Sequence, residues 1–230
     1  MNNKKKGEMI MKYFKKLVGE RIYLSPRNAE DVEQFTEWMN DFEVTDYIGR
    51  TAQMISLSGE KEFLEKNANP ESTFVIVDLK DDVMIGTVSL EKINRVDSKA
   101  TLGIFIGRSE YRSKGYGAEA INLILDFGFN YMNLNSINLT VLDCNERAKA
   151  CYNKCGFKET GRERQGKFVN GKYYDAIING VSSSVFPQVP VDYGYRDNKN
   201  FWYTRFKRPI SEPIPASKGI SLDTVKYAAS

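Results

Sequence analysis

The chain has 230 residues, a hydrophobic fraction of 41%, a charged fraction of 27% and a net charge of +3. This length and composition are typical of one ordinary globular domain with, at most, an appendage. The net charge is too small to indicate nucleic-acid binding by itself, although it suits small anionic ligands. The sequence contains no histidine. This excludes Ser-His-Asp and Cys-His hydrolases and leaves proton transfer to Glu, Asp, Tyr, Lys, Cys or water.

The three cysteines, Cys144, Cys151 and Cys155, lie close together in the sequence. Because no histidine accompanies them, we expect reduced thiols and no metal site, with two of the cysteines packed on one helix. No apolar run approaches the roughly 18 residues that a membrane-spanning helix requires, and we find no signal-peptide core. We therefore expect a cytoplasmic protein without a membrane partner.

The first part of the chain predicts one strand and two helices. Residues 1–16 form a lysine-rich basic arm, and residues 21–24 have the pattern of a strand. Asn28 is a suitable N-cap for a helix whose apolar side chains share one face. Residues 41–57 are expected to form a loop, and a short second helix follows Ser58.

From Thr73 onward the pattern changes to strands. Apolar alternation and helical periodicity predict strands at 74–77, 84–90, 100–106, 136–142, 157–168 and 172–178, and helices at about 114–133 and between Asn145 and Gly156. Asn170-Gly171 is a strong signal for the turn of the last hairpin. The order β-α-α-β-β-β-α-β-α-β-β indicates a mixed α/β layer structure.

The stretch Arg112–Ala118 is the turn between an apolar strand and the following helix. A strand that turns sharply into a helix leaves the first backbone N–H groups of that helix unpaired. Gly115 and Gly117 carry no Cβ atom, so an anionic group can approach this backbone closely. The helix dipole, Arg112 and Lys114 add positive charge, which together predict a pyrophosphate cradle. The alternative is a glycine-containing turn that binds nothing, since short glycine motifs also occur by chance.

Two motifs and two flanking segments resemble one known family. The motifs are R-x-x-G-x-G-A at 112–118 and N-E-R-A-K-A-C-Y-N-K-C-G-F at 145–157. With them, the chain resembles the GCN5-related N-acetyltransferases. The segments L-V-G-E-R-I-Y-L at 17–24 and N-G-K-Y-Y-D at 170–175 are similar to the branch with the ribosomal-protein and spermidine acetyltransferases. The resemblance covers about residues 17–180.

The resemblance implies a fold and a division of the chain. The expected fold class is α/β (α+β), with a mixed, mostly antiparallel sheet of six to seven strands and helices on both faces, as in acyl-CoA N-acyltransferases. The acetyltransferase domain would occupy residues 17–180, after the arm at 1–16. Residues 181–230 form an extension rich in proline and aromatic side chains, which the family does not explain. We expect this extension to dock on its own domain, close the acceptor cleft or join a homodimer.

The resemblance also places the co-substrate, acetyl-CoA. The turn, with Arg112 beside it, would hold the pyrophosphate of coenzyme A, mainly through the backbone N–H groups of Ser113, Lys114, Gly115, Tyr116, Gly117 and Ala118. The strand residues Ile104, Phe105 and Ile106 would pair with the pantetheine arm where the strands at 100–106 and 136–142 splay apart. Asn145 would hydrogen-bond pantetheine. A plain N-cap is the alternative role of Asn145, and the two roles are compatible.

Tyr152 matches the family tyrosine that points at the acetyl-CoA sulfur. A phenol with a pKa near 10 stays protonated at neutral pH and can protonate or hydrogen-bond the departing thiolate. The alternative is a core tyrosine that packs beside Ala148 and Cys155.

The general base is not identified by the sequence. Many members of this branch carry a glutamate early in the strand before the glycine turn, where this chain has Thr101. Glu91, Glu33 and Glu43 are the candidates, and their spacing does not choose among them.

The sequence thus predicts an acetyl-CoA-dependent N-acetyltransferase that moves acetyl directly to a primary amine. Polyamines or other small amines and a protein N-terminus are equally compatible acceptors. The alternative is a non-catalytic acyl-CoA-binding or protein-interaction module on the same fold. Nucleic acid is not expected as a partner.

Overall fold

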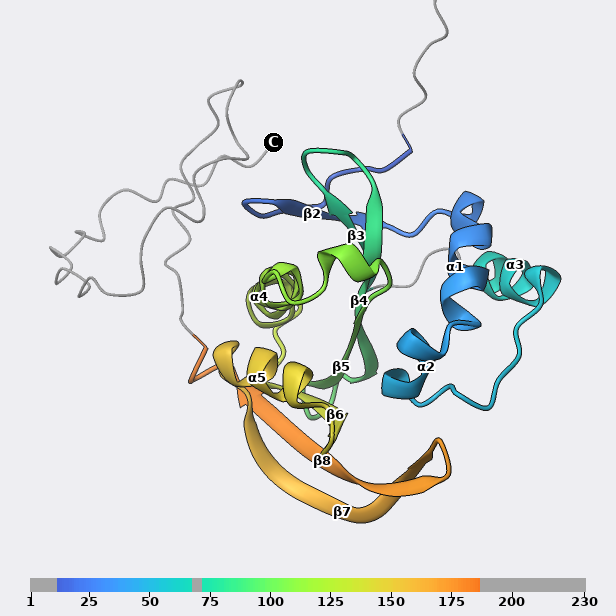
Figure 1. The fold of residues 1–230 in the computed structure, drawn as a ribbon. Helices are drawn as coiled ribbons and strands as arrows, with labels where there is room; N and C mark the ends of the chain where they lie inside the picture. The colour runs from blue at the N-terminus through green and yellow to red at the C-terminus, as the bar shows by residue number, and fades with distance from the viewer. Residues whose placement is uncertain (1–11, 68–71, 187–230) are drawn as a thin grey trace, which may run out of the picture. The chain divides into compact units, whose positions relative to one another are not determined.

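The computed structural model describes residues 12–67 and 72–186, which form a mixed sheet with helices on both faces (Figure 1). The strand order is β1-β2-β3-β4-β5-β6-β8-β7, and every neighbouring pair is antiparallel except β5 and β6. The strands are β1 (Leu17–Val18), β2 (Ile22–Pro26), β3 (Thr73–Asp78), β4 (Met84–Asn94), β5 (Lys99–Ile106), β6 (Ser136–Leu142), β7 (Lys158–Val169) and β8 (Lys172–Ser182). The helices are α1 (Val32–Met39), α2 (Phe42–Ile48), α3 (Leu57–Lys66), α4 (Tyr116–Asn130) and α5 (Glu146–Lys154).

The expected fold class is confirmed. The sheet has eight strands, because the two-residue β1 adds to the seven strands that the sequence predicts. Most of the expected basic arm and of the aromatic extension, residues 1–11 and 187–230, lies outside the described residues. No helix of the described residues is long and apolar enough to cross a membrane.

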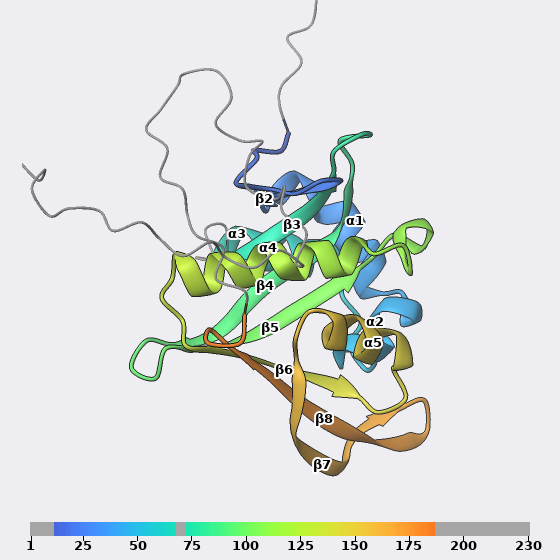
Figure 2. The same ribbon diagram turned by 90° about the vertical axis from the view of Figure 1, so that its left-hand side faces the viewer.

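Each face of the sheet has its own apolar core. On one face, α4 packs Ile121, Ile124 and Leu125 against the strands, and α5 joins the same core (Figure 2). On the other face, α1 packs Phe35 and Trp38 against the upper part of β3 and β5. The periodic apolar side chains of each helix therefore face the sheet, as their spacing predicts.

Residues 41–57 are not the loop that we expected. They contain α2, which Asp41 caps by accepting a hydrogen bond from the N–H of Glu43 at 2.9 Å, and which Gly49 ends in the left-handed conformation. A helix of seven residues gives too short a pattern for periodicity to detect. The next helix begins at Leu57, slightly earlier than predicted, because Ser56 is its N-cap.

The two central strands splay apart as expected. β5 and β6 pair only at Lys99–Thr101 with Ser136–Asn138. Beyond this point β5 keeps its partner β4, and β6 keeps its partner β8. From Leu102 onward, the edge of β5 that faces β6 therefore has backbone groups without a strand partner.

Candidate active site

The turn before α4 exposes a run of unpaired backbone donors. Ser113 and Gly115 have φ angles of 60° and 88°, and α4 begins at Tyr116. Within the described part of the chain, none of the six N–H groups of Ser113–Ala118 donates a hydrogen bond. Left-handed residues in such a turn bring successive N–H groups into one concavity, which binds anions. The helix dipole adds a positive partial charge at the same place.

Gly117 leaves this concavity open, although the surrounding packing does not require a glycine at this position. A Cβ atom built at Gly117 would meet nothing closer than the Sγ atom of Cys151, at 3.9 Å. The packing of the protein therefore tolerates a side chain here, and a glycine inside a helix costs about 1 kcal/mol relative to alanine. The packing of the fold therefore does not require a glycine at position 117, and the missing side chain leaves this backbone accessible.

The side chain of Arg112 already has partners within the protein. Its Nε and Nη2 atoms donate to the carbonyl oxygens of Ile106 and Gly107 at 3.0 and 2.8 Å, and Nη1 donates to Glu43 at 2.9 Å. The side chain is 12% exposed. Because its donors are directed into the protein, Arg112 holds the end of β5 to α2. Lys114 is exposed, forms no ion pair in the described residues, and remains the free cation of the turn.

The side chains of β5 lie on both faces of the sheet beside the splay. Phe105 packs its ring against Trp38 at 5.7 Å, while Ile104 and Ile106 pack against the core below α4. These contacts hold the strand in place while the backbone edge towards β6 stays open. Ile104, Phe105 and Ile106 are therefore placed where an extended chain with amide groups can pair.

Asn145 and Tyr152 lie on α5, at the far side of the splay. The side-chain oxygen of Asn145 accepts a hydrogen bond from the N–H of Ala148 at 3.1 Å, which confirms the N-cap. The side-chain amide NH₂ of Asn145 has no partner in the described residues, so it stays available as a donor. The cap and a ligand contact are therefore compatible.

Tyr152 combines packing with an unused hydroxyl group. Its ring contacts Phe157 at 6.0 Å and packs against the core below α4. Its hydroxyl group makes no hydrogen bond within the described residues. Burial, and after it the neighbouring thiols Cys151 and Cys155, raise the pKa of Tyr152 above its ordinary value. The phenol therefore stays a neutral proton donor at neutral pH.

The three candidate carboxylates lie in different surroundings. Glu43 pairs with Arg112, and Glu33 is exposed on α1. Glu91 lies on β4 directly opposite Thr101. Its Oε1 atom accepts a hydrogen bond from the hydroxyl of Ser89 at 2.8 Å.

The missing side chain of Gly103 leaves room for the carboxylate of Glu91. A Cβ atom built on Gly103 would lie only 3.0 Å from Oε1 of Glu91, so the carboxylate occupies space that a side chain of β5 would fill. Gly103 is two residues beyond Thr101, where the pairing of β5 with β6 ends. A neighbouring strand thus delivers a carboxylate to the splay. Sequence reasoning could not select Glu91, because its position depends on the register of β4 against β5.

A cavity of about 550 Å³ opens between α2 and the start of α5. Its walls mix aromatic rings with charged groups of both signs: Phe42, Glu43, Asp46, Tyr47, Arg112, Cys144, Asn145, Glu146 and Arg147. One oxygen of Asp46 accepts a hydrogen bond from Asn170 in the β7–β8 turn. The other oxygen, Oδ1, is buried and has no partner in the described residues. A buried carboxylate oxygen without a donor costs free energy, which a cation that reached it would offset.

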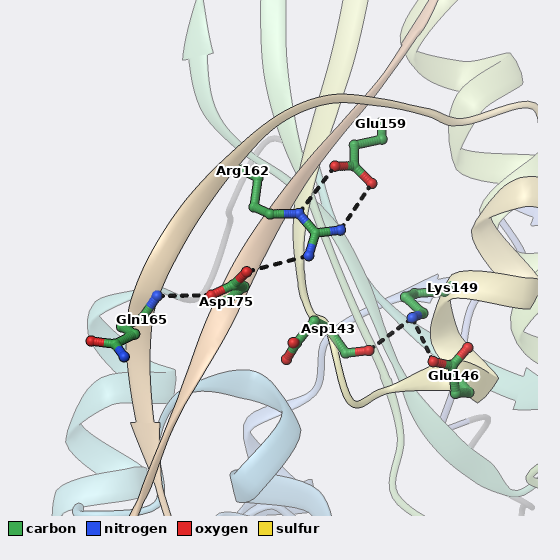
Figure 3. A network of polar contacts seen from close by, with 7 residues as sticks. All are labelled: Asp143, Glu146, Lys149, Glu159, Arg162, Gln165 and Asp175. Atoms are coloured by element: carbon green, nitrogen blue, oxygen red, sulfur yellow. Dashed lines mark hydrogen bonds and ion pairs between the residues drawn. The ribbon is translucent and has the colours of Figure 1, made fainter.

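A second cavity, of about 420 Å³, lies between α5 and the β7–β8 hairpin. Its charges are paired among themselves, as Figure 3 shows: Arg162 lies between Glu159 and Asp175, and Lys149 contacts Glu146 at 2.6 Å. Because these charges already have partners, the network stabilises the hairpin and offers little to a ligand. The three cysteines are free thiols. In residues 12–67 and 72–186, no cluster of three or more His, Cys, Asp or Glu side chains could hold a metal ion.

Comparisons with known proteins show which family the chain belongs to. Residues 21–158 match the family described as Acetyltransferase (GNAT) domain. The chain belongs to the GNAT acetyltransferase family. It is an N-acetyltransferase of this family, whose members use acetyl-CoA. The more finely drawn domain limits, 17–180, stay a prediction.

This GNAT chain is similar in sequence to several known acetyltransferases. Over 158 residues it is 31% identical to spermidine N(1)-acetyltransferase of Escherichia coli (strain K12), covering 68% of this chain and 83% of that enzyme. Over 107 residues it is 37% identical to spermidine N(1)-acetyltransferase of Vibrio cholerae, covering 46% of this chain and 61% of that enzyme. Over 99 residues it is 30% identical to a putative ribosomal N-acetyltransferase of Bacillus subtilis, covering 43% of this chain and 54% of that protein.

The fold is also that of a solved relative. The structure of spermidine N-acetyltransferase from Vibrio cholerae in complex with CoA and spermine superimposes with a TM-score of 0.67 at 27% identity. The match covers 73% of this chain and 98% of the relative. The described elements of this GNAT domain therefore span nearly the whole fold of that relative.

Proposed function

We propose that this protein transfers acetyl from acetyl-CoA directly to the primary amine of a cationic acceptor of the polyamine class. The observation that carries the proposal is the run of six unpaired N–H groups at Ser113–Ala118, one end of the splay between β5 and β6. A pyrophosphate satisfies these donors, and the open edge of β5 then accepts the amides of the pantetheine arm.

The chemical step uses groups from two strands and one helix. The open backbone of β5 polarises the thioester carbonyl, as backbone donors do in oxyanion holes. Glu91 accepts the proton of the attacking amine, directly or through water, and Tyr152 gives its proton to the departing thiolate. These two proton transfers use a carboxylate and a phenol, so they require neither a histidine nor a metal ion. Burial raises the pKa of Tyr152, so the phenol is protonated at neutral pH and its O–H is available to the departing sulfur.

The cavity at α2 supports this choice of acceptor class. Asp46 and Glu43 supply carboxylates, of which Glu43 is already paired with Arg112, and Phe42 and Tyr47 supply rings that attract cations. The solved relative from Vibrio cholerae binds spermine, and two named relatives acetylate spermidine, which supports a polyamine over a protein N-terminus. A polyamine carries several charges that such a cavity can pair.

The placement of the cofactor is tested with two glycine variants. Gly117→Asp puts a carboxylate into the donor concavity, whereas Gly161→Asp makes the same change in β7, where a Cβ atom also has room, with its nearest neighbour at 3.8 Å. We expect calorimetry to show a loss of CoA affinity for the first variant and no change for the second. A folded Gly117→Asp protein with unchanged CoA affinity would refute the placement.

The reaction itself is tested by thiol release. Wild-type protein is given acetyl-CoA with spermidine, spermine, a monoamine or a peptide with a free N-terminus. We expect free CoA to accumulate fastest with the polyamines. Protein that binds CoA but releases no thiol with any of these amines would support the non-catalytic binding module instead.

A further inference from the structure

The turn between β1 and β2 is tied to the first turn of α4. The backbone N–H groups of Arg21 and Ile22 both donate to Oε1 of Glu119, at 2.8 and 3.3 Å, and Nε of Arg21 donates to Oε2 at 3.0 Å. Glu119 is 15% exposed in its side chain. Two segments almost a hundred residues apart are thus joined beside the donor concavity at Ser113–Ala118.

Arg21 also contacts the concavity itself. Its Nη1 atom donates to the carbonyl oxygen of Lys114 at 2.9 Å. A trans peptide group points its C=O and its N–H in opposite directions. Because Arg21 draws the Lys114 carbonyl towards itself, the N–H of Gly115 points away from Arg21, into the space where the unpaired donors gather.

The guanidinium of Arg21 lies over the ring of Tyr116, the first residue of α4. Its carbon is 4.6 Å from the ring centre of Tyr116, and that ring packs edge-on against Tyr111 at 5.2 Å. A Cβ atom built on Gly115 would lie 3.2 Å from Nη2 of Arg21, so glycine leaves room for this approach. Arg21, Tyr116 and Gly115 form one packed unit.

Glu119 would weaken anion binding if it stood alone. It lies in the first turn of α4, at the same helix end as the donor concavity. A carboxylate there stabilises the helix but repels a pyrophosphate bound one turn away. Arg21 neutralises that charge through its bond to Oε2. A lysine, with one compact ammonium group, does not reproduce a fork that contacts Glu119 and the Lys114 carbonyl together.

We infer that Arg21 is a positioning residue for the pyrophosphate site, which aims the N–H of Gly115 and neutralises Glu119. Arg21 makes these contacts from another part of the sheet, and it acts through the turn and not on the thioester. The inference rests on the proposed function, since it concerns how that same site holds its co-substrate.

The test compares two acetyl donors. S-acetyl-pantetheine has the thioester and amides of acetyl-CoA but no pyrophosphate. For Arg21→Gln, we expect kcat/KM with acetyl-CoA to fall about 10- to 100-fold, as for the loss of a hydrogen bond to a charged group. With S-acetyl-pantetheine, kcat/KM should stay unchanged, and so should kcat at saturating acetyl-CoA. Arg21→Lys should recover only part of the loss.

Two further variants separate the causes. Arg21→Gln combined with Glu119→Gln should regain part of the acetyl-CoA affinity, because the unneutralised carboxylate is gone. Arg27→Gln is the matched control: Arg27 also donates to a carbonyl, that of Asn67 at 2.8 Å, and also lies beside a ring, that of Phe63 at 5.3 Å. Arg27 contacts Phe63 in α3 and Asn67 just after this helix, so Arg27→Gln should leave kcat/KM unchanged with both acetyl donors.

Three outcomes would overturn the inference. An equal loss of kcat/KM with both donors would show a general structural role for Arg21. If the wild type binds CoA and Arg21→Gln leaves kcat/KM unchanged with both acetyl donors, Arg21 does not act on the pyrophosphate site. If wild-type protein binds no CoA in calorimetry, the proposed function fails, and this inference with it.

Discussion

The donor turn at Ser113–Ala118 and the cavity beside α2 meet at Arg112, and they are built in different ways. The turn is made of backbone N–H groups from six consecutive residues. The cavity is made of side chains from α2, from α5 and from Arg112, with the β7–β8 turn held against it through Asn170. Arg112 belongs to the turn by its backbone and to the cavity by its side chain.

This difference predicts which mutations affect acetyl-CoA binding and which affect acceptor binding. A backbone site requires only that small residues keep it accessible and that its conformation is held, so few of its side chains matter. A side-chain site depends on the identity of each group that lines it. We therefore expect substitutions in the cavity to alter the choice of acceptor, while the glycines and Arg21 determine the affinity for acetyl-CoA.

The largest effect is expected for Tyr152→Phe. Phenylalanine keeps the ring contact with Phe157 but removes the proton that the thiolate receives. The single-turnover rate with a saturating amine should fall about 10²- to 10⁴-fold, with little change in acetyl-CoA affinity. Tyr173→Phe, an exposed tyrosine of the hairpin, is the control. A chemical rate within about threefold of wild type, below the range for a lost general acid, would leave Tyr152 as a packing residue.

Glu91→Gln should have the next largest effect, because the amide cannot accept a proton. We expect the rate at neutral pH to fall about 10²-fold, the lower end of the range for a general base. The loss should shrink as the pH rises, since the amine then loses its proton to the solvent. Glu33→Gln, an exposed change on α1, should behave as wild type. A loss that is the same at every pH would argue against proton transfer by Glu91.

Asp46→Asn tests the cavity, where it removes a charge but keeps the shape of the side chain. We expect KM for a polyamine to rise about tenfold, as for the loss of a hydrogen bond to a charged group, with kcat little changed. Asp41→Asn is the matched control on the same helix, because Asp41 caps α2 and asparagine caps equally well. If both variants keep the KM of wild type, the acceptor does not bind at Asp46.

The smallest effect is on stability, and it concerns Asp175 in the β7–β8 hairpin. A hydrogen bond from the N–H of Gln165, and then the side chain of Arg162, lower the pKa of Asp175 below its ordinary value (Figure 3). A lowered pKa stabilises the folded state above the unfolded pKa of about 3.9, and this stabilisation is lost as the pH falls further. Thermal melts should show Asp175→Asn slightly below wild type at pH 7, with the difference vanishing towards pH 3. A difference that stays constant down to pH 3 would mean that the charge of Asp175 is not its source.

Local patterns predicted most of the elements, the cap of α5, the hairpin turn and the turn before α4. The Asn145 cap, the Asn170-Gly171 turn and the helix after Gly115 each depend on residues close together in the sequence, so spacing and residue type suffice to predict them. The splay of β5 and β6 was implied by the resemblance and is present.

Tertiary structure alone decided the contacts between distant segments. Strand register brings Glu91 over Gly103, and folding brings Arg21 to Lys114 and pairs Arg112 with Glu43. A long side chain binds whichever partner the assembled fold presents, and single-sequence spacing carries no record of that partner. For the same reason the unpaired oxygen of Asp46, on a helix too short to be predicted, became visible only when α2 was placed beside the hairpin turn.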